Sequence, residues 1–345
     1  MGAGKRVRFA VLPAILALGD QVLLSGIHSR KPHAVPLPDG TQLSTSTSLN
    51  AKHFEDIDIV IVAVRTNAIW GVLNALNDIP RKKDISIVMD TPPLRLSDFV
   101  KMRTFSGFKS VIVGEDWFKL SPILLIKDLI TRGAIGGALH QIKLDRMSYR
   151  YHGLVTLRSI AGTRWFRSIK ATMAEDGKTS YSVVTGNGIS CRAILPRDYT
   201  RGTLYVAGNR GWISNHVPDG DAGDGHLIGF PLEESGWYQP ISLDGNMLPS
   251  DAVDQNVTSL PLEYLEDNTA INRLKIRGYA RLVEDLMTDN VEYDIIDGLY
   301  DYFATAAVER LKRFCDLPVR NSQQSVLRIV LSLHQYERQT PECYL

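Results

Sequence analysis

The sequence lacks the features that would assign a function class directly. Its 39 Lys and Arg residues nearly balance 38 Asp and Glu residues, so the net charge of +1 gives no support for a nucleic-acid partner. Three cysteines without a C-x-x-C pair indicate neither a disulfide framework nor a cysteine-rich zinc site, and they favour the reducing cytoplasm. No G-x-S-x-G, Walker or H-E-x-x-H motif is present. The commonest hydrolase, P-loop and zinc-protease sites are thereby excluded.

Long apolar runs are also missing. The N-terminal run from Phe9 to Leu18 contains Pro13, is too short to span a bilayer and has no signal-peptide cleavage pattern. We therefore expect no membrane segment and no membrane partner.

The chain is long enough, at 345 residues with 44% hydrophobic content, for two domains. Strand and helix patterns alternate from about residue 21 to 117, as in a doubly wound α/β domain. The expected elements are a helix over 5–18, a buried strand over 21–31, a loop over 32–48, strands within 56–66, 84–93 and 108–117, and helices within 68–80 and 94–107. We expect the first domain to cover 1–118 and the second 119–345.

The second part of the chain has a different pattern of expected elements. A helix over 121–137, with Gly133 near its C-cap, precedes several short strands between 165 and 262 that predict an antiparallel or mixed sheet. Helices are expected again over 272–314 and 322–336.

The order of these pieces resembles the Gfo/Idh/MocA oxidoreductase family. The segments that carry the resemblance are "GAGKRVRFAVLPAI", "DIDIVIVAV", "MDTPP", "EDWFKLSPILLIKDLITRGAIGG", "YHGLVTLRSIAG" and "YDIIDGLYDYFATAAVERL". The resemblance implies a Rossmann-type doubly wound parallel sheet followed by an α+β open-faced sheet domain. It also implies a nicotinamide cofactor, a small-molecule substrate and a homodimer formed through the sheet of the second domain.

The glycine turn of this resemblance stands at the start of the sequence. Gly2 and Gly4, with Lys5 and Arg6, would cradle a pyrophosphate at a helix N-terminus, although Val7 replaces the third glycine of the fingerprint. If the alignment holds, the first Rossmann strand is missing from this polypeptide. The alternatives are that "RVRFAVL" is itself the first strand, or that the glycines belong to a flexible terminus.

The end of the second expected strand favours NADP. A carboxylate here would bind the ribose hydroxyls of NAD, whereas this sequence has Ser29, Arg30 and Lys31, a hydroxyl and two cations suited to a 2′-phosphate. A solvated basic loop is the alternative.

Further cofactor contacts are expected at strand ends, where α/β sheets bind ligands. Val64 and Arg65 follow one strand, and Asp90, Thr91 and Pro92 follow the next. Arg65 could bind a cofactor phosphate or a substrate carboxylate through two hydrogen bonds, or it could form a structural ion pair.

The resemblance implies a catalytic lysine, aspartate and histidine, and the sequence departs from this set twice. Thr91 occupies the lysine position, and Ser148 stands where the aspartate is expected, four residues before His152. His152 is retained as a candidate proton donor or orienting group, since histidine can exchange protons near neutral pH. Its alternative is a partly buried histidine at a helix start.

Three other residues are candidates for the missing catalytic groups. Tyr149 and Tyr151 flank His152 and could donate a proton with help from a neighbouring cation, or they could simply pack. Lys119 could replace the lost amine, or it could be a surface lysine.

The sequence therefore predicts an NADP-dependent oxidoreductase, with a biosynthetic reduction of C=N or C=O favoured because reducing an imine demands less of a base. A pseudoenzyme that serves as a binding partner, and a lyase or cyclase on the same fold, are alternatives. No metal site is expected, since "DGDAGDGH" (Asp219, Asp221, Asp224, His226) lacks the Glu of an EF-hand loop, and His28 and His33 have no ligand partner at helical spacing.

Overall fold

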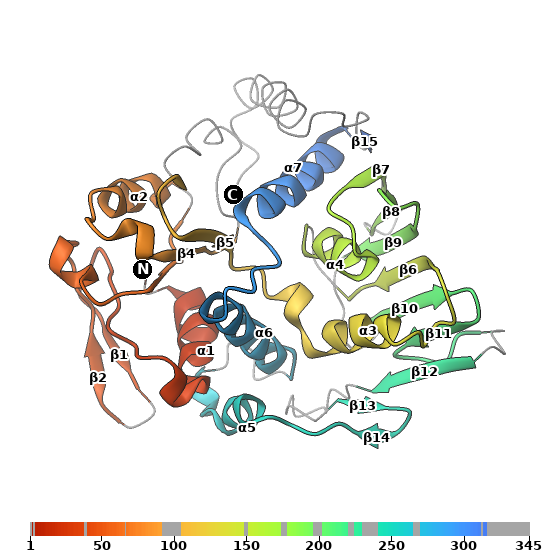
Figure 1. The fold of residues 1–345 in the computed structure, drawn as a ribbon, viewed down its shortest axis with the longest axis horizontal. Coiled ribbons are helices and arrows are strands. Elements are labelled where there is room, and N and C mark those ends of the chain that lie inside the picture. Colours follow the sequence, from red (N-terminus) through yellow and green to blue (C-terminus); the bar gives the residue numbers. More distant parts are fainter. Residues whose placement is uncertain are drawn as a thin grey trace. The chain divides into compact units, whose positions relative to one another are not determined.

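A computed structural model describes residues 2, 4–37, 40–65, 67–91, 105–147, 151–173, 178–195, 202–219, 224–229, 241–264, 270–311 and 313–315 (Figure 1). The described chain forms two compact units. The first combines the residues up to Asp116 with Ser250–Leu299, and the second holds most residues between Trp117 and Pro249 and those from Tyr300 onward.

Ser250–Leu299 thus returns to the first unit, although the sequence placed it in the second domain. An amphipathic helix shows that one of its faces is buried, but not which distant element covers that face.

The first unit contains a small parallel sheet, a hairpin and several helices. Its elements are β1 (Ala34–Pro36), β2 (Gln42–Ser44), β3 (Ile59–Val62), β4 (Ser86–Met89), β5 (Ser110–Val113), α1 (Leu12–Ala17), α2 (Ile69–Asn77), α5 (Ala252–Ser259) and α6 (Ala270–Met287). Helix α7 (Ile295–Leu311) begins in the first unit and continues in the second.

The parallel sheet has the strand order β3-β4-β5. Ile59 lies opposite Ser86, and Ser86 lies opposite Ser110, so the three strands run in register with their carboxyl ends at one edge. All four residues of β4 are buried, as expected for a central strand with helices on its faces. The α/β fold class predicted from the sequence is confirmed.

The strand expected over 21–31 does not form. Residues 22–27 have no strand structure, and only His28 makes an isolated parallel bridge, to Ser46. Leu23 is 89% exposed. A strand gains its backbone hydrogen bonds from a neighbour, and no strand of the described chain pairs with this segment, so its apolar residues alone do not order it as a strand.

The expected helix at the N-terminus is confirmed, which rules out "RVRFAVL" as a strand. Residues 5–17 are helical, with a π-helical stretch at Val7–Val11 that leads into α1. Pro13 has no N–H to donate to the turn before it, and the wider π turn ends at Val11, shortly before this proline.

The second unit is built on a ten-stranded mixed sheet with the order β14-β13-β12-β11-β10-β6-β9-β8-β7-β15. Its elements are α3 (Ser121–Thr131), β6 (Leu139–Asp145), α4 (Tyr151–Ala161), β7 (Phe166–Met173), β8 (Thr179–Thr185), β9 (Ser190–Leu195), β10 (Thr203–Gly208), β11 (Gly211–Ser214), β12 (Asp224–Gly229), β13 (Ser242–Leu243), β14 (Asn246–Met247) and β15 (Arg313–Cys315).

Helix α4 packs against β6 and β9, and α3 packs against α4, so both helices lie on one side of this sheet (Figure 1). Along β9 the residues alternate between this covered side, where Cys191 and Ala193 are buried, and the opposite side, where Ser190 and Arg192 are exposed. The open-faced sheet predicted for the second domain is confirmed.

Other predicted elements have mixed outcomes. The helix over 121–137 is α3, and Gly133 follows it with a left-handed φ of 82°. The helices expected over 94–107 and 322–336 fall almost entirely or wholly outside the described residues. None of the described helices has the length and apolar character needed to cross a membrane.

Candidate functional site

The glycine turn lies at the carboxyl end of β3. The Gly2 N–H donates to the carbonyl of His28 at 2.7 Å, and Gly2 has a φ of 106°. A Cβ added to Gly2 would lie 2.2 Å from the carbonyl oxygen of Ala63, so only glycine fits this approach. Gly2 therefore lies between His28, near the end of the strand expected over 21–31, and the end of β3.

The helix that follows presents its N-terminus at this edge. Gly4 is exposed, and a Cβ added there would meet no atom within 4 Å. Helical structure begins at Lys5, which is also exposed. A helix start beside a glycine turn offers backbone N–H groups and a positive dipole end to an anion.

Arg6 lies one residue further and joins the ends of two strands. Its Nε donates to Asp90 Oδ1 at 2.9 Å, and its Nη1 donates to Asp116 Oδ2 at 3.3 Å. Asp90 directly follows β4, and Asp116 follows β5 by three residues. The side chain of Arg6 is 29% exposed, whereas that of Asp116 is 1% exposed. Two carboxylates therefore share one guanidinium, leaving a net charge of −1 when all are ionised.

The pKa values of this cluster respond to both burial and charge. Burial disfavours the charged form of Arg6, but Asp116 and Asp90 outweigh it and raise the Arg6 pKa. Burial raises the pKa of Asp90, against the opposing effect of Arg6. Arg6 also lies 5.3 Å from the ring centroid of Tyr279 on α6. Burial raises the pKa of the Tyr279 phenol, whose hydroxyl has no hydrogen-bond partner in the described chain.

The sequence analysis missed Asp116 and Tyr279. Asp116 follows a predicted strand as part of "GED", so the rule that strand ends face ligands could have found it. Tyr279 comes from the part of the chain that was assigned to the other domain, and no local signal indicates its place.

The residues predicted to bind a 2′-phosphate, Ser29, Arg30 and Lys31, lie at or near the surface of the first unit. Arg30 and Lys31 are exposed, and neither has an ion-pair partner in the described chain. Ser29 is half-buried, and its N–H donates to the carbonyl of Ser46 at 2.9 Å. The neighbouring His28 has a buried Nδ1 without a partner among the described residues, and burial lowers its pKa.

The remaining strand-end candidates follow β3 and β4. Val64 is half-buried and Arg65 is exposed beyond the end of β3. Thr91 is half-buried beyond the end of β4. Pro92, Ser148 and Tyr149 lie outside the described residues, so their predictions stay untested.

The catalytic candidates of the second unit gather at the start of α4. His152 is half-buried, and its ring stacks on Trp117 at 5.3 Å between centroids. The ring centroids of Tyr151 and His152 lie 4.3 Å apart with the ring planes tilted, and Tyr151 is buried. Lys119, in the same turn as Trp117, is only 6% exposed, so the surface-lysine alternative is wrong. The turn Trp117–Lys119 packs against α4, which brings these candidates into one neighbourhood.

No group of three or more metal-ligating side chains lies together in the described part of the chain. His226 instead pairs with Asp244, at 2.8 Å between Nδ1 and Oδ2. Asp221 lies outside the described residues.

Comparison with known proteins finds likeness only at the level of the fold. No family model matches the sequence, and no curated protein is similar to it in sequence. The WlbA dehydrogenase from Bordetella pertussis, solved with NADH and UDP-GlcNAcA, superposes with a TM-score of 0.56 over 92% of this chain and 96% of its own, at 15% identity. The chain has the Gfo/Idh/MocA fold.

Two further structures share this fold. Myo-inositol dehydrogenase from Lactobacillus casei, solved with NAD(H) and myo-inositol, matches with a TM-score of 0.52 and 15% identity over 79% of this chain and 81% of its own. A super-repressor mutant of Gal80p from Saccharomyces cerevisiae matches with a TM-score of 0.50 and 13% identity over 84% of this chain and 93% of its own.

The first unit carries groups that suit a phosphate-bearing ligand. Gly4 is exposed beside a helix start that offers N–H groups to an anion, and Arg30 and Lys31 are exposed cations without an ion-pair partner among the described residues. Arg6 is an exception among the predicted phosphate ligands, because Asp90 and Asp116 already hold its guanidinium.

Proposed function

We propose that this protein is an NADP-dependent oxidoreductase acting on a small molecule, with reduction of a C=N or C=O bond as its reaction. The observation that carries the proposal is the exposed glycine turn at Gly4, at the start of a helix, in a unit that also exposes Arg30 and Lys31, two cations without an ion-pair partner among the described residues.

The proposal of NADP over NAD rests on charge. The WlbA dehydrogenase was solved with NADH and the myo-inositol dehydrogenase with NAD(H). In this chain residues 29–31 supply no carboxylate, and two cations there favour a ligand with one more phosphate dianion.

In this proposed reaction, the first unit would bind the cofactor and the second would supply the proton. When bound, the nicotinamide supplies a hydride. Lys5, Arg30 and Lys31 would hold the phosphates, while Arg6 keeps Asp90 and Asp116 in place at the strand ends. In the second unit the stacking of His152 on Trp117 fixes the plane of its imidazole, and the hydroxyl of Thr156 donates to the His152 carbonyl at 2.8 Å, which anchors the first turn of α4.

His152 is therefore our candidate for the group that gives a proton to the substrate nitrogen or oxygen. Lys119 and Tyr151 line the same neighbourhood and would set its charge and shape. Thr91 and Ser148, in the positions of a lysine and an aspartate, supply no strong base, which suits a reduction better than the oxidation of an alcohol.

Fluorescence titration with NADPH and NADH tests the proposal. We expect saturable NADPH binding, and we expect Arg30→Ala to weaken it about tenfold while changing NADH binding little, because one charge-assisted hydrogen bond is lost. Lys83→Ala, another exposed cation of the first unit, is the matched control. Absence of saturable binding, or equal losses in both variants, would reject the NADP assignment.

A binding protein without catalysis is the second candidate. The negative charge left by Asp90 and Asp116 lies near the phosphate turn, and the fold is also found in a repressor protein. Incubation of the protein with 4-deuterated NADPH of each stereochemistry and a metabolite extract separates the two. Deuterium in a product supports the reductase, whereas tight NADPH binding without transfer from either face supports the binding protein.

A further inference from the structure

The Arg6 cluster, which consists of Arg6, Asp90 and Asp116, carries more negative than positive charge. Arg6 Nε donates to Asp90 at 2.9 Å, and Arg6 Nη1 donates to Asp116 at 3.3 Å. Neither carboxylate has a second ion-pair partner in the described chain. One positive and two negative charges leave the ionised cluster with an excess of negative charge.

The residue after Asp90 does not compensate this charge. The family resemblance implies a lysine in that position, and this chain has Thr91. Thr91 is half-buried beyond the end of β4 and adds no charge. A lysine beside Asp90 would neutralise the cluster, whereas the shorter, uncharged threonine leaves the excess negative charge available to a ligand.

The cluster is closed on one side and partly open on the other. The side chain of Asp116 is 1% exposed, against 13% for Asp90 and 29% for Arg6. Tyr279 is fully buried, and a Cβ added to Gly114 would lie 3.0 Å from its Oη. The Gly114 carbonyl also accepts from Arg6 Nη2, at 3.4 Å. A ligand can therefore reach Asp90 and Arg6 from outside, but not Asp116.

The buried phenol of Tyr279 indicates that the cluster takes a further polar group. Its hydroxyl has no hydrogen-bond partner in the described chain, and it interacts electrostatically with Arg6, Asp90 and Asp116. Buried polar groups nearly always have a partner. The Tyr279 ring also keeps water away from the inner side of the cluster, where charges attract one another more strongly than in water.

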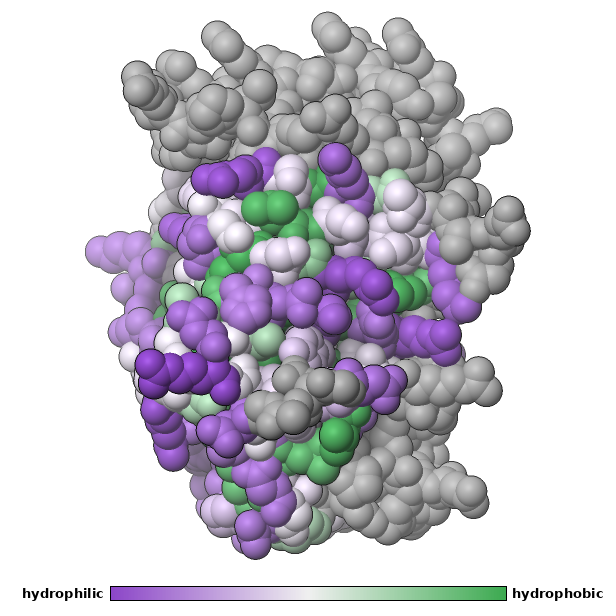
Figure 2. Space-filling view, turned by 90° about the vertical axis from the view of Figure 1, so that its right-hand side faces the viewer, coloured by the Kyte–Doolittle hydropathy of each residue, from purple (hydrophilic) through white to green (hydrophobic). Residues whose placement is uncertain are grey.

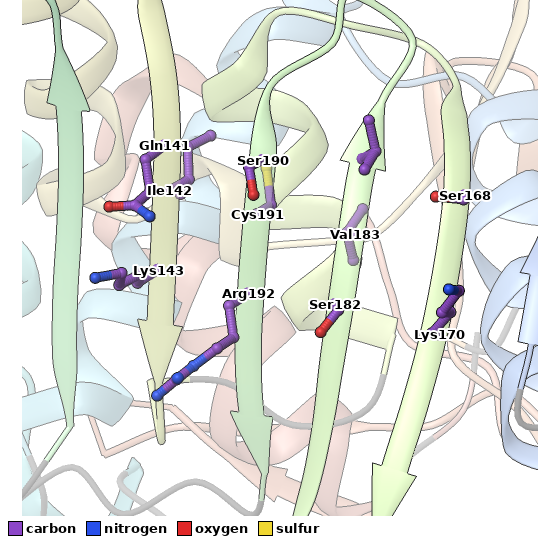
Figure 3. Close-up of a pocket in the computed structure, with 11 residues that line it drawn as sticks. Gln141, Ile142, Lys143, Ser168, Lys170, Ser182, Val183, Ser190, Cys191 and Arg192 are labelled. Carbon is purple, nitrogen blue, oxygen red and sulfur yellow. The ribbon is translucent and has the colours of Figure 1, made fainter.

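The two units differ in the sign of the charge that they offer to a ligand. Figure 2 views the molecule from the right-hand side of Figure 1, where the sheet of the second unit lies, and shows hydrophilic residues over much of the described surface. On this sheet Lys143, Lys170 and Arg192 point to one face (Figure 3), and only Arg192 pairs with a carboxylate, that of Asp145, in the described chain. A small cation is repelled by these residues and attracted by the Arg6 cluster.

We propose, building on the function proposed above, that the substrate is a small iminium ion, the protonated form of a C=N bond, and that Asp90 binds its positively charged nitrogen. Asp90 directly follows β4, at the edge where α/β sheets bind ligands. A hydrogen bond from a charged N–H to a carboxylate is stronger than one between neutral groups. A carbonyl compound has no N–H and no charge, so the cluster selects C=N over C=O.

This substrate also agrees with the altered catalytic positions. The iminium carbon accepts a hydride with its two electrons from the reduced nicotinamide, and the π electrons of the C=N bond move to nitrogen. The products are a neutral amine and the oxidised nicotinamide. Because the nitrogen carries its proton before the transfer, the step needs no base from Thr91 or Ser148.

Calorimetric titration of the full chain, at one ionic strength balanced with NaCl, tests the cation site without turnover. The probes are pyrrolidinium, piperidinium and tetrahydroisoquinolinium chlorides, and the uncharged matched probes are tetrahydrofuran, tetrahydropyran and isochroman. We expect at least one cation to bind about tenfold more tightly than its ether. Asp90→Asn should remove this preference, because the amide keeps an acceptor for Arg6 but has no charge. Thr91→Lys should remove it too, by neutralising the cluster while Asp90 remains.

Asp84→Asn is the matched control, since Asp84 is another carboxylate of the first unit that pairs with an arginine, Arg81. It should keep the preference for the cation. Turnover of the corresponding cyclic imines with NADPH should have a kcat/KM about tenfold lower in Asp90→Asn than in Asp84→Asn.

Fluorescence titration of the same protein with NADPH separates this proposal from the one above. If NADPH binds but no cation is preferred over its ether, or if Asp84→Asn acts like Asp90→Asn, the iminium assignment is overturned and the NADP assignment stands. If a cation is preferred through Asp90 but NADPH does not bind, the reductase is rejected and with it the iminium as a substrate.

Discussion

Two arginines, one in each unit, hold carboxylates from distant parts of the chain, and they do so in different surroundings. Arg158 of α4 and Asp301 of α7 are 5% and 0% exposed, and the Nε and Nη2 atoms of Arg158 donate to the two carboxylate oxygens at 2.8 to 3.3 Å. Arg158 also donates to the carbonyl of Arg164 at 2.9 Å. Arg6, by contrast, is 29% exposed and shared between Asp90 and Asp116.

The comparison separates a structural ion pair from a cluster that remains open to ligands. Charge in the Arg158–Asp301 pair is balanced, and the pair ties two helices together within the second unit. The Arg6 cluster keeps a negative charge and one partly solvated side, at the strand ends where α/β sheets bind ligands. The same residue types therefore serve packing in one unit and are available to a site in the other.

Removing one carboxylate from each cluster gives the largest expected effect. Asp301→Ala removes the carboxylate that balances the buried Arg158 cation, so we expect the free energy of unfolding to fall by about 3–5 kcal/mol. Asp116→Ala leaves Arg6 paired with Asp90 and partly hydrated, so we expect a loss of about 1–2 kcal/mol. Urea unfolding followed by tryptophan fluorescence measures both.

If Asp116→Ala lowers the free energy of unfolding as much as Asp301→Ala does, the distinction between the two arginine clusters is wrong. Asp128→Ala, which breaks an exposed pair with Arg132, is the reference and should change the free energy of unfolding by less than about 1 kcal/mol.

Much of the fold could be predicted from local patterns. The β-branched run around Ile59–Val62 and the alternation along β9 follow from which side chains must be buried. The segment at 21–31 shows the limit, because its apolar residues were compatible with a buried strand but strand formation depends on a neighbour elsewhere in the chain. Likewise the helical pattern of α6 could not show that α6 packs against α1.

The site was predictable only in part for the same reason. The glycine at position 2 has a local explanation, because its positive φ and its close backbone approach to Ala63 exclude other residues. The partners of Arg6 lie 84 and 110 residues away in sequence, so its ion pairs could not be read from its neighbours. Charge alone suggested a phosphate ligand, and the structure gives the guanidinium two carboxylates instead.

The glycine turn of the first unit gives the next largest effect and sharpens the contrast between a strained and a relaxed position. Gly2→Ala would place a Cβ 2.2 Å from the Ala63 carbonyl in a left-handed backbone, which should cost about 1–3 kcal/mol and weaken NADPH binding at least tenfold. Gly4→Ala adds a methyl group to open space and should leave stability within about 0.5 kcal/mol of the wild type. Equal losses in the two variants would contradict this placement of the turn.

The smallest effect concerns pH and again separates the two units. Burial lowers the pKa of His28 in the folded first unit below its unfolded value of about 6.5. Between these two pKa values the unfolded chain binds more protons than the folded chain, so the free energy of unfolding should rise with pH in this window. The contribution of His28 to stability should be complete above about pH 6.5 and should be lost as the pH falls from there through the folded-state pKa. Urea unfolding at pH values from about 5 to 8 should show this slope, and His28→Gln should reduce it. His140→Gln, at an exposed position on β6 of the second unit, should leave the slope as in the wild type. If His140→Gln removes the slope and His28→Gln does not, the imidazole of His28 is not its source.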